Sequence, residues 1–288
     1  PVVLAPAMNE KMYESPATQE AIRILSTWSN ITMLECADGA LACGTSGRGR
    51  MQEIDVIKAA IEYAITPKTL TDKHILITAG PTHEAIDPVR YISNASTGKM
   101  GYALVKSCLK RGAKVTLVTG PTHISVEGWK AFSPLTIRPV VSSSEMCEAT
   151  VAEADSADIC ILCAAVADFT PSTTANQKIK KEAGQTSLTL ELQTTTDIAA
   201  ALGKKKRKNQ TLVGFALETH NELANAERKM QAKNLDMIVL NSLQDQGAGF
   251  GVDTNKVTLL YPDGTQKKLP LKSKEEVADA IIDAINPF

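Results

Sequence analysis

Short apolar segments alternate with amphipathic segments from Lys73 to the end of the chain, and this alternation restricts the fold most strongly. The apolar runs predict buried strands, and the segments between them repeat apolar residues at helical spacing. We expect strands at 75–78, 115–118, 159–164, 212–216 and 237–240, and helices at 98–112, 144–154 and 221–233. Such alternation is typical of a mostly parallel sheet flanked by helices, so the sequence predicts an α/β, Rossmann-like domain.

Two segments depart from the alternation. Residues 178–192 begin with a basic stretch and end in the alternating sequence SLTLEL. Residues 256–271 have the pattern of a hairpin around Pro262-Asp263-Gly264. Strands in these two segments could extend the sheet or form an additional β arm.

The composition excludes some classes of function. The 288 residues are 43% hydrophobic and carry a net charge of -1, so the chain can fill the core of one large or two ordinary domains. The balanced charge argues against a polyanion partner such as nucleic acid. The longest apolar runs are too short to span a bilayer, and the first residues have neither a basic stretch nor a cleavage site. We therefore expect a soluble cytoplasmic protein with no membrane partner.

Three patterns that suggest metal or nucleic-acid binding have simpler interpretations. Cys160 and Cys163 form a C-x-x-C pattern within an expected strand, where a separation of three sends the side chains to opposite faces. We expect two buried thiols there. The four histidines lack partners at ligand spacing, which argues against zinc. The run KKKRK at 204–208 has no interleaved aromatic residues and is expected to be a solvated loop.

Segment 78–101 leaves an apolar strand, makes a polar excursion and enters a helix at Gly98. Glycines permit tight turns and close backbone approach, and the helix amino terminus offers free N–H groups to an anion. The P-loop pattern fails because Met100 follows Lys99, and the dinucleotide pattern fails after Gly80. We therefore predict an anion pocket at the carboxyl edge of the sheet that has no standard nucleotide fingerprint.

The polar excursion, DPVRYISN at 87–94 followed by STGKMG, resembles the opening motif of phosphopantothenate cysteine ligase, a family of coenzyme A biosynthesis. Two further blocks match in the same order: AAVAD at 164–168 followed by KIKK at 178–181, and GFALET at 214–219. The match runs from about Lys73 to the last residue. The resemblance implies a reaction that joins 4'-phosphopantothenate and L-cysteine through an acyl-nucleotide, in a homodimer whose β arm makes the contact.

The first 66 residues resemble the carboxyl-terminal part of the flavin-dependent phosphopantothenoylcysteine decarboxylase that bacteria fuse to this ligase. Residues 6–13, PAMNEKMY, look like its substrate-binding motif, with Asn9 in place and Tyr13 where Trp is usual. Residues 42–51 look like its flap, with Cys43 as the acid. The family's flavin-binding strands and catalytic histidine have no counterpart, so we expect a truncated bifunctional protein.

This resemblance divides the chain and names its small molecules. It implies a remnant of a flavodoxin-like decarboxylase domain at 1–66, a linker at 67–72 and the ligase domain at 73–288. FMN and decarboxylase activity are expected only in the full-length fusion. The bacterial arrangement implies CTP as the nucleotide, together with Mg²⁺, although no residue here reads a base edge in a way that separates CTP from ATP.

The resemblance also assigns site residues. Lys178 is expected to close over the nucleotide phosphates, which suits a step in which an anion attacks a polyanion. Asp168 is expected to recognise the nucleotide or organise its Mg²⁺. On the phosphopantothenate side, the amide of Asn94 and the guanidinium of Arg90 would hold the intermediate and an anionic group. The remaining expected contacts are Ala165 for the substrate and Ala164, Thr196, Asp197, Ile198, Phe215, Lys229 and Lys233 for the nucleotide.

Two other classes of protein share parts of this pattern. An NAD(P)-dependent Rossmann oxidoreductase would use the glycine-rich turn at 97–101, but that turn lies well after its strand and the next strand ends without a ribose-binding acid. A non-catalytic nucleotide-binding regulatory subunit would keep the fold. The presence of Arg90, Asn94, Asp168 and Lys178 together favours the enzyme.

Overall fold

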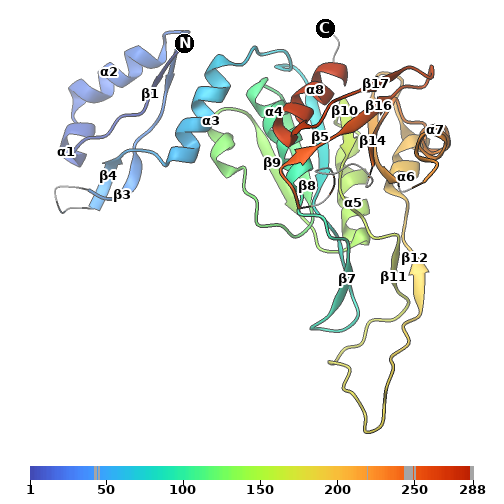
Figure 1. The fold of residues 1–288 in the computed structure, drawn as a ribbon. Helices are drawn as coiled ribbons and strands as arrows, with labels where there is room; N and C mark the ends of the chain where they lie inside the picture. The colour runs from blue at the N-terminus through green and yellow to red at the C-terminus, as the bar shows by residue number, and fades with distance from the viewer. Residues whose placement is uncertain (42–43, 45, 219, 243–248, 250, 286–288) are drawn as a thin grey trace.

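The computed structural model describes residues 1–41, 44, 46–218, 220–242, 249 and 251–285 (Figure 1). Its amino-terminal unit contains a parallel pair of strands, an antiparallel pair and two helices. The elements of this unit are β1 (Val2–Leu4), α1 (Glu10–Tyr13), α2 (Pro16–Ser26), β2 (Ile31–Met33), β3 (Ala37–Ala40) and β4 (Ser46–Arg50). Helix α3 (Ile54–Ile65) follows and leads into the main domain.

Within the described residues, the main domain is built on an eight-stranded sheet in the order β17-β16-β14-β13-β10-β5-β8-β9. Its strands are β5 (His74–Ala79), β8 (Lys114–Thr119), β9 (Leu135–Pro139), β10 (Ile159–Leu162), β13 (Thr211–Glu218), β14 (Met237–Ser242), β16 (Val257–Leu260) and β17 (Gln266–Lys268). Within this sheet, β14, β13, β10, β5, β8 and β9 pair in parallel with their neighbours in that order. Strands β16 and β17 add an antiparallel edge beside β14. The expected mostly parallel α/β fold is confirmed.

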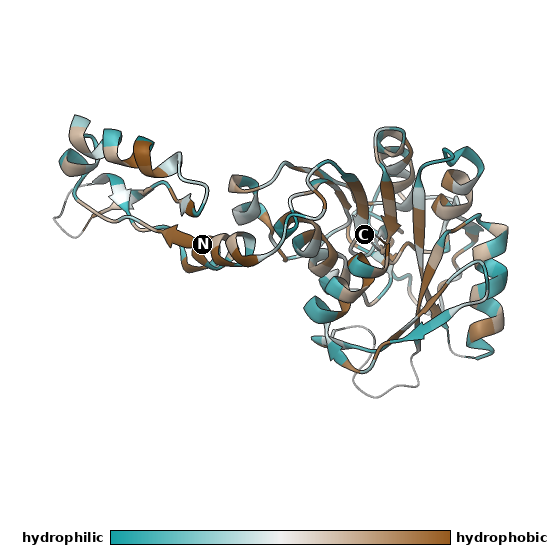
Figure 2. Ribbon diagram, turned by 90° about the horizontal axis from the view of Figure 1, so that it is seen from above, coloured by the Kyte–Doolittle hydropathy of each residue, from teal (hydrophilic) through white to brown (hydrophobic). Residues whose placement is uncertain are grey.

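Helices cover both faces of this sheet. The larger core holds α4 (Lys99–Lys110) and α8 (Lys274–Ile285), and the other core holds α5 (Ser143–Ala154), α6 (Ile198–Lys205) and α7 (Glu222–Ala232). In β5, Ile75 and Ile77 belong to the first core and Leu76 to the second. A central parallel strand buried on both faces is apolar throughout, and Figure 2 shows hydrophobic residues concentrated in these strands.

Shorter elements surround the carboxyl edge of the sheet. Strands β6 (His83–Ala85) and β7 (Tyr91–Ser93) form a hairpin, and β11 (Phe169–Pro171) pairs with β12 (Leu192–Thr194). The segment between β11 and β12 projects away from the sheet (Figure 1), and we call residues 169–194 the arm. The other short elements are β15 (Thr254–Asn255), β18 (Lys272–Ser273) and the 3-10 helix η1 (Glu127–Ala131).

The structure resolves one open alternative and differs from the expectations in several details. The hairpin at 256–271 extends the sheet, and of the alternating SLTLEL sequence only Leu192 lies in a strand. The strand expected at 159–164 ends at Leu162, and β9 was not expected at all because its sequence LTIRP is short and ends in proline. The solvated loop expected at 204–208 is wrong for Lys204 and Lys205, which belong to α6. It is also wrong for Lys206, whose Nζ lies 2.8 Å from Asp236 Oδ1 with only 13% of the side chain exposed.

Helix α3 and the residues after it lie against the main domain. Ala59 belongs to the larger core, and the rings of Tyr63 and Phe132 stack with centroids 5.6 Å apart. The ammonium of Lys68 donates to the carbonyl of Lys110 at 3.2 Å, and Leu70 is buried. The residues expected to form the linker, 67–72, are therefore held by packing in this structure.

Gly101 allows α4 to approach β5 closely, which fixes the start of the helix at the sheet edge. A Cβ at this position would lie 2.5 Å from the Cβ of Ala79. We expect Gly101→Ala to lower the free energy of unfolding by about 1–3 kcal/mol, because neither the helix nor the strand can shift cheaply. Denaturant unfolding measures this change. Gly128→Ala is the control, since its Cβ would meet Val56 at an ordinary 3.4 Å, and equal stability of the two variants would contradict the expectation.

Candidate active site

A cavity of about 600 Å³ opens at the carboxyl edge of the sheet, between the ends of β10 and β13 and the amino terminus of α6. Ligands of open α/β sheets bind at this edge. The sequence-predicted residues that line the cavity are Asn94, Ala164, Ala165, Asp168, Thr196, Asp197, Ile198, Phe215, Lys229 and Lys233. The fold therefore brings together residues that lie far apart in the sequence, from Asn94 to Lys233.

Asn94 links the β6–β7 hairpin to the segment after β10. Its Nδ2 donates to the carbonyl of Ala165 at 3.0 Å and to that of Val166 at 3.1 Å. The same segment is held by Thr82, whose hydroxyl accepts from the N–H of Ala167 at 3.0 Å. These bonds set the backbone that leads to Asp168, whose side chain is exposed at the cavity rim.

Asp197 caps the amino terminus of α6. Its Oδ1 accepts from the N–H of Ala200 at 2.9 Å, and its Oδ2 lies 2.9 Å from Lys233 Nζ. Burial alone would raise the pKa of Asp197, but the bonds from Ala200 and Lys233 outweigh it and hold that pKa below its usual value. Amide hydrogens at a helix amino terminus attract anions, so this end of α6 suits a phosphate or a ribose hydroxyl.

Lys229 of α7 and Lys233, which caps the end of that helix, are each paired with a carboxylate. Lys229 Nζ lies 2.6 Å from Glu218 Oε1, and Lys233 is paired with Asp197. Each of the two ammonium groups therefore has a carboxylate partner from another part of the chain. A polyanion that binds here must compete with the two carboxylates or bring its own cation.

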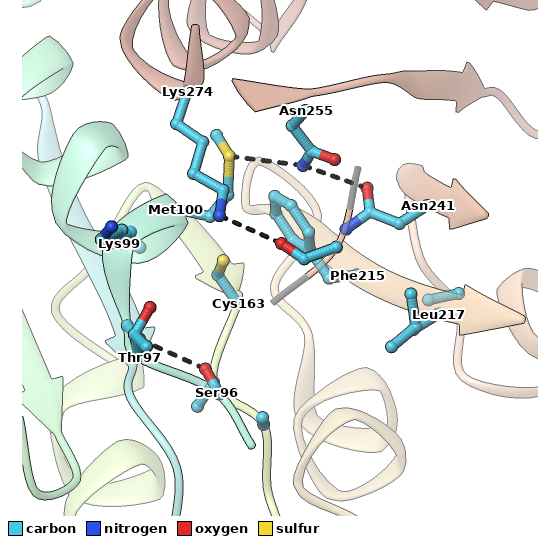
Figure 3. A pocket seen from close by; sticks show the side chains of 16 residues that line it. Ser96, Thr97, Lys99, Met100, Cys163, Phe215, Leu217, Asn241, Asn255 and Lys274 are labelled. Atoms are coloured by element: carbon cyan, nitrogen blue, oxygen red, sulfur yellow. Dashed lines mark hydrogen bonds between the residues drawn. The ribbon is translucent and has the colours of Figure 1, made fainter. Parts of the chain in front are cut away.

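A smaller cavity of about 130 Å³ continues from the first and shares Ala164, Ala165 and Phe215 with it. Figure 3 shows Lys274, Asn255 and Asn241 around it, opposite the start of α4. Gly98 caps that helix with φ of 80°, a left-handed conformation that favours glycine.

Lys274 was missed by the sequence reasoning. The residue is only 7% exposed, and its Nζ donates to the carbonyls of Gly249 at 3.1 Å and Val252 at 2.6 Å. Burial lowers the pKa of this lysine. A lysine as the first residue of a helix opposes the helix dipole, and this unfavourable position in α8 is the signal that could have found it.

Arg90 and Lys178 do not line either of these cavities. Arg90 lies between the β6–β7 hairpin and the arm, beside a hollow of about 250 Å³ that is formed with residues 179–181 and 185–188. Its Nη2 donates to the carbonyl of Ile179 at 2.9 Å. Lys178 is exposed and directly precedes Ile179. The structure thus brings Arg90 and Lys178 to one place, apart from the other predicted residues, and the roles assigned to both stay predictions.

The amino-terminal unit holds the two remaining predicted residues. Asn9 caps α1, its Oδ1 accepts from the N–H of Lys11 at 2.9 Å, and it lines a hollow of about 410 Å³ with Met8, Arg50 and Met51 among others. Cys43 lies outside the described residues.

The described cysteines are thiols rather than disulfides. Cys160 and Cys163 pack into the cores on opposite faces of the sheet, as their spacing predicts, and burial raises the pKa of each to about 12. Within the described ranges, no three His, Cys, Asp or Glu residues are grouped so as to hold a metal ion. In the same part of the chain, every helix is too short or too polar to cross a membrane.

Two family descriptions match the chain. Residues 70–288 match the DNA/pantothenate metabolism flavoprotein C-terminal domain, and residues 1–66 match the family called Flavoprotein. The chain is 46% identical over 288 residues to the coenzyme A biosynthesis bifunctional protein CoaBC of Bacillus subtilis (strain 168), covering 99% of this chain and 69% of that protein. It is 39% identical to CoaBC of Escherichia coli (strain K12), again covering 99% and 69%.

Other relatives extend the comparison. A cysteine/cysteine sulfinic acid decarboxylase from an unknown prokaryotic organism is 47% identical over 290 residues, covering 99% of this chain and 79% of that protein. Among solved structures, the C-terminal domain of a CoaBC protein matches with a TM-score of 0.62 and 38% identity over 76% of this chain and 97% of that chain. A Cab2 mutant in complex with phosphopantothenate-cysteine matches with a TM-score of 0.58 at 19% identity, which shows a shared fold.

Proposed function

The chain belongs to the DNA/pantothenate metabolism flavoprotein C-terminal domain family, with CoaBC proteins among its relatives, and on this premise we propose that residues 73–288 form a CTP-dependent phosphopantothenate cysteine ligase. The observation that carries the proposal is the large cavity, in which residues assigned to the nucleotide and to phosphopantothenate meet at one sheet edge. Its volume of about 600 Å³ suits a nucleotide together with an acyl group.

The proposed reaction has two steps. The carboxylate of 4'-phosphopantothenate attacks the α-phosphorus of CTP, which releases pyrophosphate and leaves an acyl-cytidylate. The amine of L-cysteine then attacks the acyl carbon, loses a proton, and releases CMP. The first step brings an anion to a polyanion, so neutralisation of charge is the main demand on the protein.

Residues of the cavity supply that neutralisation and hold the acyl group. The start of α6 and the ammonium groups of Lys229 and Lys233 would contact the nucleotide, and Glu218 and Asp197 are the carboxylates that pair with these two lysines. Phe215, which lies within β13, would pack on the base. The amide of Asn94 lies beside the carbonyl of Ala165 and would orient the acyl-nucleotide.

Mg²⁺ would enter with the nucleotide as part of the substrate. The described residues offer no cage of three ligands, and Mg²⁺ commonly uses one or two carboxylates together with substrate phosphates and water. The exposed carboxylate of Asp168 at the cavity rim fits that arrangement. CTP rather than ATP, and a cytoplasmic location, rest on the resemblance to bacterial fusion proteins. FMN would belong to the decarboxylase of the full-length fusion, and we assign no flavin step to the hollow at Asn9.

A second copy of the chain would complete the site. Large apolar side chains are exposed on the arm and on the segments beside it, and these are Val89, Tyr91, Val141, Phe169, Leu188 and Leu192. Exposed apolar groups gathered on a projecting segment favour a protein contact. Arg90 and Lys178 lie apart from the cavity of their own chain, so we propose that a homodimer brings them to the cavity of the partner.

Pyrophosphate release tests the proposed function. The purified chain is mixed with Mg²⁺, 4'-phosphopantothenate and either CTP or ATP, with cysteine left out. We expect pyrophosphate to be released in an amount close to that of the enzyme with CTP, and only when phosphopantothenate is present. Absence of pyrophosphate with both nucleotides, although the chain is folded, would reject the ligase and favour a binding subunit.

A further inference from the structure

Asp87 is a buried carboxylate that connects the β6–β7 hairpin to the arm. The residue is 3% exposed. Its Oδ1 accepts from the N–H groups of Val89 and Arg90, each at 2.9 Å, which closes the turn between the two strands. Its Oδ2 accepts from the Nε of Arg90 at 3.0 Å, from the Nη2 of the same residue, and from the N–H of Ile179 at 3.1 Å.

Both backbone groups of Ile179 are held by this arrangement. The N–H donates to Asp87, and the carbonyl accepts from Arg90 Nη2 at 2.9 Å. Two further bonds tie the preceding residues of the arm to the hairpin, from Ala175 N–H to the carbonyl of Ile86 and from the Thr174 hydroxyl to the carbonyl of Ala85. The arm is therefore attached up to Ile179, and Lys178 lies on the attached side.

The chemistry of the contacts requires a charged carboxylate. All the groups that face the two oxygens are donors, and one of them is a guanidinium. The hydrogen bond from Arg90 holds the pKa of Asp87 well below its usual value. A lowered pKa keeps the carboxylate of Asp87 charged at neutral pH, so the donors of Arg90 and Ile179 face a charged acceptor there.

We propose that Asp87 is a positioning residue. Its carboxylate holds the backbone of Ile179 and the guanidinium of Arg90 in fixed positions relative to each other, and this contact positions the neighbouring Lys178 to bind the nucleotide phosphates. This inference rests on the proposed function for the part played by Lys178. The attachment itself is a property of the free chain and is measured without any substrate.

Asp87→Asn should remove the contacts of this side chain with the arm and keep its contacts within the turn. An asparagine oxygen still accepts from Val89 and Arg90 in the turn, whereas its NH₂ group faces the donors of Arg90 and Ile179 and cannot bind them. Glu84→Gln is the matched control. Glu84 is a 2% exposed carboxylate on the same hairpin, and its partners are the N–H and hydroxyl of Ser143 at the start of α5.

Brief digestion of the ligand-free protein with trypsin measures the attachment. We expect the bond between Lys178 and Ile179 to be cut about tenfold faster in Asp87→Asn than in wild type or Glu84→Gln, because local opening becomes easier. Cleavage after Lys181, beyond the attached residues, is the internal reference and should change little. Equal rates at Lys178 in all three proteins would overturn the inference.

The rate of the first turnover measures how the attachment of the arm affects pyrophosphate release. In Asp87→Asn we expect the first turnover of pyrophosphate release to slow by about 10- to 100-fold, as for a displaced catalytic group, with the KM for CTP within about threefold of wild type. In a Lys178→Gln background, Asp87→Asn should have little further effect because both changes act through one group. An undiminished effect in that background, or an equal loss in Glu84→Gln, would overturn the inference.

A variant that fails to fold and a wild-type chain without activity each need a separate measurement. If Asp87→Asn fails to fold, Ile179→Pro removes the N–H that Asp87 accepts from and leaves the carboxylate in place, and slow pyrophosphate release in it is the expected result. Wild-type release by Ile179→Pro would then reject the inference. If the wild-type chain releases no pyrophosphate, the proposed function fails, whereas the comparison of trypsin cleavage still decides whether Asp87 attaches the arm.

Discussion

Lys178→Gln is expected to slow the formation of the acyl-nucleotide by about 10²- to 10³-fold, the effect of losing one charged donor to the transition state, or about 3–4 kcal/mol. Lys178 is exposed and precedes the residue at which the arm is attached, so the substitution should leave the fold and the thermal stability unchanged. The first turnover of pyrophosphate release, measured by rapid quench, tests the expectation.

Lys181→Gln is the matched control for this experiment. Lys181 lies further along the arm than Lys178, and its side chain is also exposed. The same loss of charge there should change the rate by less than about threefold, as expected for screened surface charges. Pyrophosphate release by Lys178→Gln at the wild-type rate, or an equal loss in both variants, would remove Lys178 from the nucleotidyl step.

Asn94→Ala is expected to affect the other half of the reaction. The variant should release pyrophosphate but consume the acyl-cytidylate slowly, so that the intermediate stays bound after cysteine is added. Its amide is neutral and bonds to the carbonyls of Ala165 and Val166, so the affinity for CTP should change by less than about tenfold, or 1.4 kcal/mol. Calorimetric titration with CTP and mass spectrometry of the quenched reaction measure the two effects.

A mixture of Asn94→Ala and Lys178→Gln chains adds a test of the dimer. If Lys178 reaches the cavity of the partner, a hybrid dimer contains one cavity with both changes and one with neither. Subunit exchange should then restore up to about half of the wild-type activity per hybrid dimer, by the arithmetic of a two-fold symmetric pair. A mixture that is no more active than its two components would place each lysine in the site of its own chain.

Much of the fold follows from the sequence. The strands β5, β8, β13 and β14 are apolar segments between helices with clear apolar faces, and all appear within two residues of their expected bounds. The capping glycine Gly98 and the capping Asp197 mark helix starts by local chemistry. Strand β9 was missed because two of its five residues are polar or charged and it ends in proline, so only pairing with β8 defines it.

The site depends more than the fold on contacts between residues that are far apart in the sequence. The spacing of Lys229 and Lys233 gives no sign of their carboxylate partners, because Glu218 and Asp197 come from other elements. Sequence spacing also gives no sign that Ile179 is held by Asp87, because the two residues are 92 positions apart. Contacts of this kind depend on how the hairpin meets the arm, which only the folded chain defines.

The identity of the intermediate tests the central claim most directly. The wild-type chain is incubated with Mg²⁺, 4'-phosphopantothenate and CTP labelled in the α-phosphate, without cysteine, then quenched and analysed by mass spectrometry. The ligase account predicts one acyl-cytidylate per active site, with pyrophosphate in equal amount, and its conversion to 4'-phosphopantothenoylcysteine and CMP once cysteine is added. Formation of CDP and inorganic phosphate would indicate an acyl phosphate instead, and that result would contradict the account.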